Sequence, residues 1–300
     1  MSVVTSLSEA VPRNSGADTG AKVVALRRTA VAGEAALAVR ADGGITRLVD
    51  LHHRDPLSLR LPQPARGDIF EASLITTSGG VVGGDKLTVA VTAGAGAQLR
   101  VYPQAAEKVY RSLGADSRIA VALAAESGAW LEWLPQETIL FDGARLRRET
   151  VVDVAPGARV LAGEFLVFGR RASGERMTHG LIHDAWRVRR AGTLAWADAL
   201  HAEGDLAAPL ASIAGLGGAG AFASVLYAAD DAPAQLDALR AVLPADTAAA
   251  RSALTAVNGL VVGRFLGDAR AVRDSYGAFW AAARSVLAGL PAALPRLWHL

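Results

Sequence analysis

The sequence contains no cysteine, and this absence removes several classes of site at once. Disulfide bonds, thiolate nucleophiles, iron–sulfur clusters and thiolate metal sites all require that side chain. A protein without disulfides suits a reducing compartment, so we expect it to be cytoplasmic.

Long apolar runs are also missing, although 51% of the residues are hydrophobic. No stretch reaches the roughly 18 consecutive apolar residues that a membrane-spanning helix requires. Basic tracts are absent too, since 31 Lys and Arg residues are nearly balanced by 29 Asp and Glu residues. We therefore expect a soluble protein that binds neither a membrane nor nucleic acid. Residues 1–21 lack a signal-peptide pattern and are predicted to form a flexible arm before a single domain of residues 22–300.

The sequence contains many short runs of alternating apolar and polar residues, from Lys22 to about Leu226. Turns that contain Gly or Pro separate these runs, as after residues 87–91 and 119–123. Alternation places successive side chains on opposite faces of a strand. The sequence therefore predicts a mainly β fold.

A repeat appears when the Gly-Ala turns at Gly96, Gly128 and Gly157 are aligned, because the surrounding pattern recurs every 29 to 32 residues. Units of this kind bury a continuous core when they stack on one another. An antiparallel sandwich built from similar hairpins gives the same pattern. The sequence is therefore consistent with two arrangements, stacked solenoid-like β-sheets and a sandwich.

The last third of the chain predicts two α-helices, near residues 231–243 and 268–290, with a hairpin turn at Asn258-Gly259 between them. Each predicted helix has apolar side chains on one face. Such side chains are candidate anchors for a partner protein. The candidates are Leu236, Leu239, Tyr276 and Trp280.

No known catalytic pattern stands out. The sequence has no Gly-x-Ser-x-Gly motif, and the glycine-rich residues 78–85 lack the Gly-Lys-Ser/Thr of a phosphate-binding loop. His179 and His183 have a spacing compatible with metal binding. Together with Glu175 they leave one alternative open, a metal- or carboxylate-dependent hydrolase.

Five carboxylates lie among apolar residues in the repeat region: Glu132, Glu137, Asp142, Glu164 and Glu175. Any single one of them is explained by solvent exposure or an ion pair. A line of carboxylates through a β body also suits a hard or borderline cation.

Five segments, taken in order, resemble the urease accessory protein family UreD, called UreH in some organisms. They are residues 79–87 with Gly-Gly-Asp, 107–112 with Lys-Val-Tyr-Arg, 131–144 with Leu-Glu-Trp-Leu-Pro-Gln-Glu, 168–175 with Gly-Arg and Gly-Glu, and 295–298 with Pro-Arg-Leu-Trp. The resemblance spans nearly the whole chain after the N-terminal arm. Residues 102–107 and the terminal Trp298-His-Leu depart from the family pattern.

The resemblance implies a non-enzymatic chaperone of urease maturation with a mainly β fold and two helices. Such a protein binds the urease apoprotein and recruits UreF, which docks the nickel-carrying GTPase UreG. A homodimer within that complex is a further expectation. The resemblance also implies an internal passage for a transient nickel ion, with no stably bound cofactor and no stable metal site.

Nine residues occupy matching motif positions and are the candidates for the nickel passage or for other family functions. They are Asp85, Lys108, Tyr110, Arg111, Glu132, Glu137, Asp142, Arg170 and Glu175. A passage needs oxygen or imidazole ligands that release the ion readily, and scattered carboxylates meet that requirement better than a closed polydentate site.

Overall fold

Strands dominate the computed structural model, which describes residues 30–299, so the arm predicted for residues 1–21 lies outside the described residues. A seven-stranded sheet contains, in spatial order, β14 (Thr193–Asp205), β13 (His179–Arg190), β11 (Arg145–Val154), β8 (Ser117–Ala125), β5 (Lys86–Ala93), β1 (Ala32–Asp42) and β2 (Ile45–Arg54). A ten-stranded sheet contains, along its main path, β16 (Ala250–Val257), β17 (Leu260–Gly267), β15 (Ala221–Ala228), β12 (Arg159–Phe168), β9 (Trp130–Trp133), β6 (Gln98–Pro103), β4 (Phe70–Thr76) and β3 (Leu57–Arg60). Its remaining strands are β10 (Thr138–Leu140), beside β12, and β7 (Glu107–Val109), beside β10. The predicted mainly β fold is confirmed.

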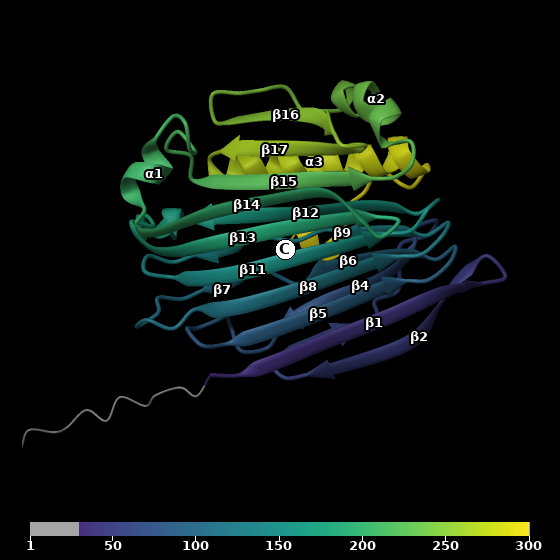
Figure 1. The fold of residues 1–300 in the computed structure, drawn as a ribbon, viewed down its shortest axis with the longest axis horizontal. Helices are drawn as coiled ribbons and strands as arrows, with labels where there is room; N and C mark the ends of the chain where they lie inside the picture. The colour runs from purple at the N-terminus through teal and green to yellow at the C-terminus, as the bar shows by residue number, and fades with distance from the viewer. Residues whose placement is uncertain (1–29, 300) are drawn as a thin grey trace, which may run out of the picture.

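One chain winds between the two sheets in successive coils (Figure 1). β5, β8 and β11 of the seven-stranded sheet lead in turn into β6, β9 and β12 of the ten-stranded sheet. Neighbouring coils run parallel and in register, so Lys86 pairs with Arg118 and Arg118 with Arg147. Of the two arrangements that the sequence left open, the structure shows solenoid-like stacking, and an antiparallel sandwich of hairpins does not describe the repeated strands.

The Gly-Ala turns stack as the strands do. Gly96, Gly128 and Gly157 all have a positive φ, between 67° and 75°. The amide of Gly96 donates to the carbonyl of Ser127 at 3.0 Å, and the amide of Gly128 donates to the carbonyl of Gly157 at 3.2 Å. A left-handed backbone at the same place in each coil explains why the repeat is visible in the sequence.

The outermost strands of the seven-stranded sheet differ from its centre. β2 and β14 both run antiparallel to their neighbours, β1 and β13. Each of these pairs contains a register shift, between Ala38 and Val39 in one and between Val188 and Arg189 in the other. The parallel stack is thus closed at both edges of this sheet by an irregular antiparallel pair.

Helices occupy the C-terminal part, as predicted, with β16 and β17 forming the predicted hairpin. The α-helices are α1 (Ala207–Ala211), α2 (Leu236–Ala241) and α3 (Ala269–Ala288). The 3₁₀ helices are η1 (Arg171–Ser173), η2 (Ala232–Gln235) and η3 (Arg296–His299). No helix within residues 30–299 is long and apolar enough to cross a membrane.

α3 lies behind the ten-stranded sheet in Figure 1 and packs on β15, β16 and β17. Its apolar side chains join the outer face of that sheet in a second core, separate from the one between the sheets. Gly163 of β12 makes the close approach possible, because a Cβ there would lie 2.0 Å from the hydroxyl of Tyr276. The missing side chain on the strand is what admits the aromatic side chain of the helix.

Replacing Gly128 by alanine is expected to lower the free energy of unfolding by about 1–2 kcal/mol, because an L side chain disfavours the left-handed conformation. Urea denaturation of the purified protein measures the change. Gly128→Asn is the control and should lose less, since asparagine tolerates this conformation better. Equal losses for the two variants would contradict the explanation from backbone conformation.

Candidate functional site

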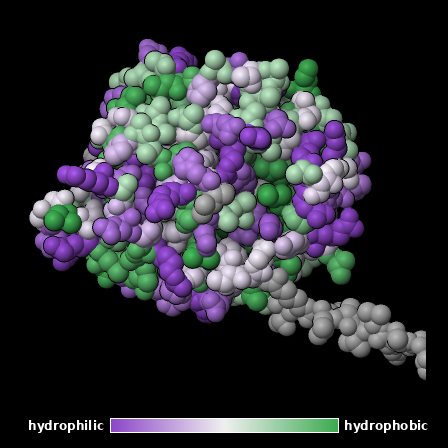
Figure 2. All heavy atoms as spheres, turned by 180° about the vertical axis from the view of Figure 1, so that it is seen from behind, coloured by the Kyte–Doolittle hydropathy of each residue, from purple (hydrophilic) through white to green (hydrophobic). Residues whose placement is uncertain are grey.

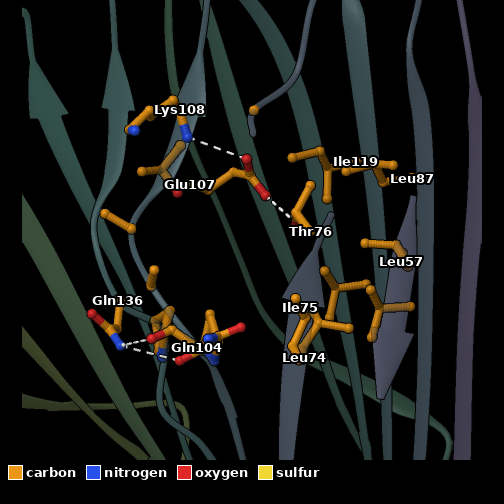
Figure 3. Close-up of a pocket in the computed structure, with 18 of the residues that line it drawn as sticks. Leu57, Leu74, Ile75, Thr76, Leu87, Gln104, Glu107, Lys108, Ile119 and Gln136 are labelled. Atoms are coloured by element: carbon orange, nitrogen blue, oxygen red, sulfur yellow. Dashed lines mark hydrogen bonds between the residues drawn. The ribbon is translucent and has the colours of Figure 1, made fainter. Parts of the chain in front are cut away.

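A cavity of about 220 Å³ lies between the two sheets. Figure 3 shows one side of it formed by apolar side chains, among them Leu57, Leu87 and Ile119. The polar side chains of Glu107 and Gln136 lie on the opposite side. The cavity therefore combines an apolar wall with a wall that carries polar side chains.

Glu107, in the short strand β7, is the first carboxylate of the cavity. Its Oε2 accepts a hydrogen bond from the hydroxyl of Thr76 at 2.5 Å, and its Oε1 accepts one from the amide of Lys108 at 3.2 Å. Burial raises the pKa of Glu107 above its ordinary value, although these two hydrogen bonds act in the opposite direction. A cation that entered the cavity would offset part of that burial cost.

Arg148 and Glu164 bring a buried ion pair to the cavity from facing sheets. Nη2 of Arg148, in β11, lies 2.6 Å from Oε1 of Glu164, in β12. The same guanidinium donates to both oxygens of Asp184 in β13, at 3.0 and 2.9 Å. Nη1 donates to the hydroxyl of Thr138 at 2.9 Å. Two carboxylates thus share one cation inside the protein.

Glu164 is the member of this group that resists ionisation. Burial raises its pKa to about 8, and the negative charge of Asp184 adds to the rise while Arg148 opposes it. Burial and the ion pair with Arg148 therefore act in opposite directions on the charge of this carboxyl group.

Of the predicted residues Asp85 and Lys108, only Lys108 is among those that line the cavity, while the charge of Asp85 raises the pKa of Glu107 slightly. Asp85 is buried, and its two oxygens accept hydrogen bonds from the amides of Val31 and Val82, each at 2.9 Å. These bonds hold the glycine-rich loop against the start of β1.

Another group of predicted residues comes together beside the loop that follows β10. Nη2 of Arg111 lies 3.2 Å from Asp142, and Arg170 forms an ion pair with Glu175. Oε1 of Glu175 accepts a hydrogen bond from the amide of Asp142 at 3.1 Å, which joins the two pairs. The hydroxyl of Tyr110 donates to the carbonyl of Gly79 at 2.9 Å. None of these five predicted residues is among those that line the cavity.

Charge pairing stabilises the ionised carboxylates in this surface group. The ion pair with Arg170 is the main reason that the pKa of Glu175 is lowered. Partial burial raises the pKa of Asp142, but hydrogen bonds from Thr178 and His179 lower it further than burial raises it. Both carboxylates are therefore ionised and already engaged with protein donors.

Glu132 and Glu137 face α3 and the C-terminal segment. Glu132 is fully buried and accepts hydrogen bonds from the indole nitrogens of Trp130, at 2.9 Å, and Trp280, at 3.1 Å. Nε of Arg284, also fully buried, donates to both of its oxygens, at 3.0 and 3.2 Å. Glu137 forms an ion pair with Arg273 of α3. In the described structure these two carboxylates dock the helix on the sheet.

The apolar helix residues also face inward. Tyr276 and Trp280 are fully buried, and Leu239 is only 1% exposed. Leu236 is partly buried against the same core. The first three side chains therefore offer no surface to a partner in the folded chain, and any surface on α3 must be its opposite face.

The three residues of the hydrolase alternative do not meet. His179 and His183 are both in β13, and four residues of extended strand span about 13 Å. His183 contacts His201 instead, and Glu175 is engaged by Arg170. Among residues 30–299, no group of three or more His, Cys, Asp or Glu side chains is placed to hold a metal ion.

Sequence reasoning did not single out Glu107 and Arg148, and it weighed Glu164 without selecting it. The sequence of β12 does indicate that Glu164 is unusual, because it is the sole charged residue between Val160 and Phe168. A carboxylate in a strand whose side chains are otherwise apolar requires a buried partner. The identity of that partner, Arg148, follows only from how the sheets face each other.

Glu132→Gln is expected to lower the free energy of unfolding by about 3 kcal/mol, because it removes one of the two buried carboxylates that pair with Arg284 and leaves only Asp68. The new amide would also direct its own N–H groups at donors. Urea denaturation measures the loss. Glu149→Gln, at an exposed position of β11, is the matched control and should change stability by less than about 0.5 kcal/mol. A Glu132→Gln variant as stable as the unmodified chain would contradict the docking role.

Comparison with known proteins places this geometry in a family. Residues 31–299 match the family model described as UreD urease accessory protein. The urease accessory protein UreD of Magnetococcus marinus is 48% identical over 261 residues, which cover 86% of this chain and 90% of the relative. The UreD protein of Xanthobacter autotrophicus is 45% identical, and the match covers 89% of each chain. The UreD protein of Azorhizobium caulinodans is 42% identical, and the match covers 91% of this chain and 98% of the relative. The resemblance of the five segments is confirmed, and the chain belongs to the UreD family of urease accessory proteins.

Proposed function

We propose that this protein is a cytoplasmic scaffold for urease maturation. It binds the urease apoprotein and UreF, through which UreG is recruited, and a nickel ion crosses the cavity between the sheets on its way to urease. Family membership supports the accessory role. The observation that carries the nickel step is the presence of Glu107 and Glu164 in one cavity between the sheets.

The ligands of the cavity suit transfer better than storage. Carboxylate, hydroxyl and amide oxygens bind Ni²⁺ less firmly than thiolates do, and the chain has no cysteine. The apolar wall formed by residues such as Leu87 and Ile119 adds no ligands. An ion would thus meet a few oxygens at a time, which favours both entry and release.

The charges around Glu164 favour a cation in the passage. The carboxylates of Glu164 and Asp184 share the single positive charge of Arg148, which leaves one negative charge uncompensated. Glu107 adds a second negative charge to the cavity when it is ionised. A divalent cation would compensate both charges while it is bound.

The outward face of α3 is the proposed contact for UreF. A shallow groove runs between this face and the C-terminal segment, and Gly277, Ala278 and Ala281 contribute its helix side while Leu294 and Trp298 contribute the other. Figure 2, viewed from behind relative to Figure 1, shows pale green, weakly hydrophobic residues toward the top, the part of the molecule where α3 lies. Small residues allow a partner helix to approach closely.

The double variant Glu107→Gln, Glu164→Gln is expected to lower the nickel content of urease by about tenfold, since each substitution removes an anionic ligand. The test expresses the variant in cells that lack the unmodified chain, and measures urease-bound nickel together with copurification of the partners. Partner binding should persist, because both substitutions lie inside the protein.

Glu149→Gln is the matched control, as it removes an exposed carboxylate on the outer face of the seven-stranded sheet, away from the cavity. Ala106→Leu reduces the cavity without removing a charge and should also lower nickel content. Normal nickel loading in both the double variant and Ala106→Leu would show that the ion takes another route.

Ala278→Glu is expected to weaken UreF binding by at least about tenfold, because it places an unpaired charge in the proposed contact. Copurification and calorimetric titration with UreF measure the effect. Ala208→Glu, at an exposed alanine of α1, controls for the added charge. Unchanged UreF binding by a folded Ala278→Glu variant would remove α3 from the contact.

A further inference from the structure

Two histidines from neighbouring strands meet on the outer face of the seven-stranded sheet. His183 of β13 and His201 of β14 are directly paired in the antiparallel register. Their Nδ1 atoms are 3.3 Å apart, and their ring centroids are separated by 5.3 Å with the planes 74° apart. The sequence alone paired His183 with His179, whereas the fold pairs it with a residue in the next strand.

The separation of the two nitrogens matches that of two ligands on one metal ion. Two imidazole nitrogens about 2.0–2.1 Å from a tetrahedral Zn²⁺ are about 3.4 Å apart. Ligands at right angles, as in octahedral coordination, are about 3.0 Å apart at the same bond length. The two Nδ1 atoms are thus already spaced for a tetrahedral Zn²⁺ ion. They would have to move about 0.3 Å closer together to bind an octahedral Ni²⁺ ion.

The charged groups beside the pair are already neutralised by one another. Arg147 is in register with His183, and its Nε donates to Asp116 at 2.6 Å. Arg145, two residues earlier in the same strand, donates to Glu203 at 2.6 Å. Each imidazole instead has the other as its side-chain hydrogen-bond partner.

Solvent reaches the site from outside the sheet. His201 is exposed and His183 is half-buried. The residue after His183, Asp184, points to the opposite face and contacts Arg148. The sheet therefore separates the histidine pair from the cavity, and the two features can be tested independently.

We propose that His183 and His201 form a surface site for a borderline divalent cation, of the class of Zn²⁺, Ni²⁺ and Cu²⁺. Both Nδ1 atoms coordinate the ion, both imidazoles are neutral with the proton on Nε2, and water completes the coordination. The backbone pairing of His183 with His201 in adjacent strands holds the two ligands in place before the ion binds. The site goes beyond the proposed passage and does not depend on it.

The test is calorimetric titration of the purified full-length protein with ZnCl₂ and, separately, NiSO₄. His183→Gln and His201→Gln should each remove one binding event or weaken it at least about 100-fold, since even loss of an outer hydrogen-bond partner of a metal ligand costs about 10- to 100-fold. The double variant should behave as each single variant does, because one imidazole alone does not make the site.

His179→Gln is the matched control, four residues away on the same face of the same strand, and should bind as the unmodified chain does. A second measurement uses the unmodified protein: substoichiometric Ni²⁺ should broaden the imidazole proton resonances of His183 and His201 before that of His179. Unchanged binding in both single variants, an equal loss in His179→Gln, or broadening that does not favour the pair would each overturn the proposal.

Discussion

Each coil of this protein must place its strands on those of the coil before, and the rest of the structure depends on this parallel register. Lys86, Arg118 and Arg147 stand in one row on the outside of the seven-stranded sheet because their strands are aligned. Side chains alternate between the faces of a strand, so a slip of one residue would exchange the two faces. Arg148 reaches Glu164 inside only because Arg147 is held outside.

The same register explains how much of the fold the sequence predicts. Gly-Ala turns recur because each coil needs a left-handed residue at the same corner, and this requirement leaves a mark in the sequence. Alternation of side chains does not reveal whether neighbouring strands run parallel or antiparallel. The repeat was therefore predictable, while the choice between solenoid and sandwich required the structure.

The candidate site was less predictable, because the side chain that a buried carboxylate contacts depends on which element packs against its strand. All four residues of β9 are buried, since the cavity side and the α3 side are both covered. Glu132 thus faces Arg284, whereas Glu164, in an equally apolar strand, faces Arg148. Local sequence identified both as unusual. It contained no information on which one lies beside a hollow space.

The irregular antiparallel pairs at the two edges of the seven-stranded sheet bear on assembly. A stack of identical parallel strands has no intrinsic end, so an unmodified edge would accept the same strand from another molecule indefinitely. Here β2 and β14 reverse the strand direction, and a register shift bends each edge pair. Among the described residues, each edge of this sheet thus ends in a bent antiparallel pair that could not continue the regular parallel stack.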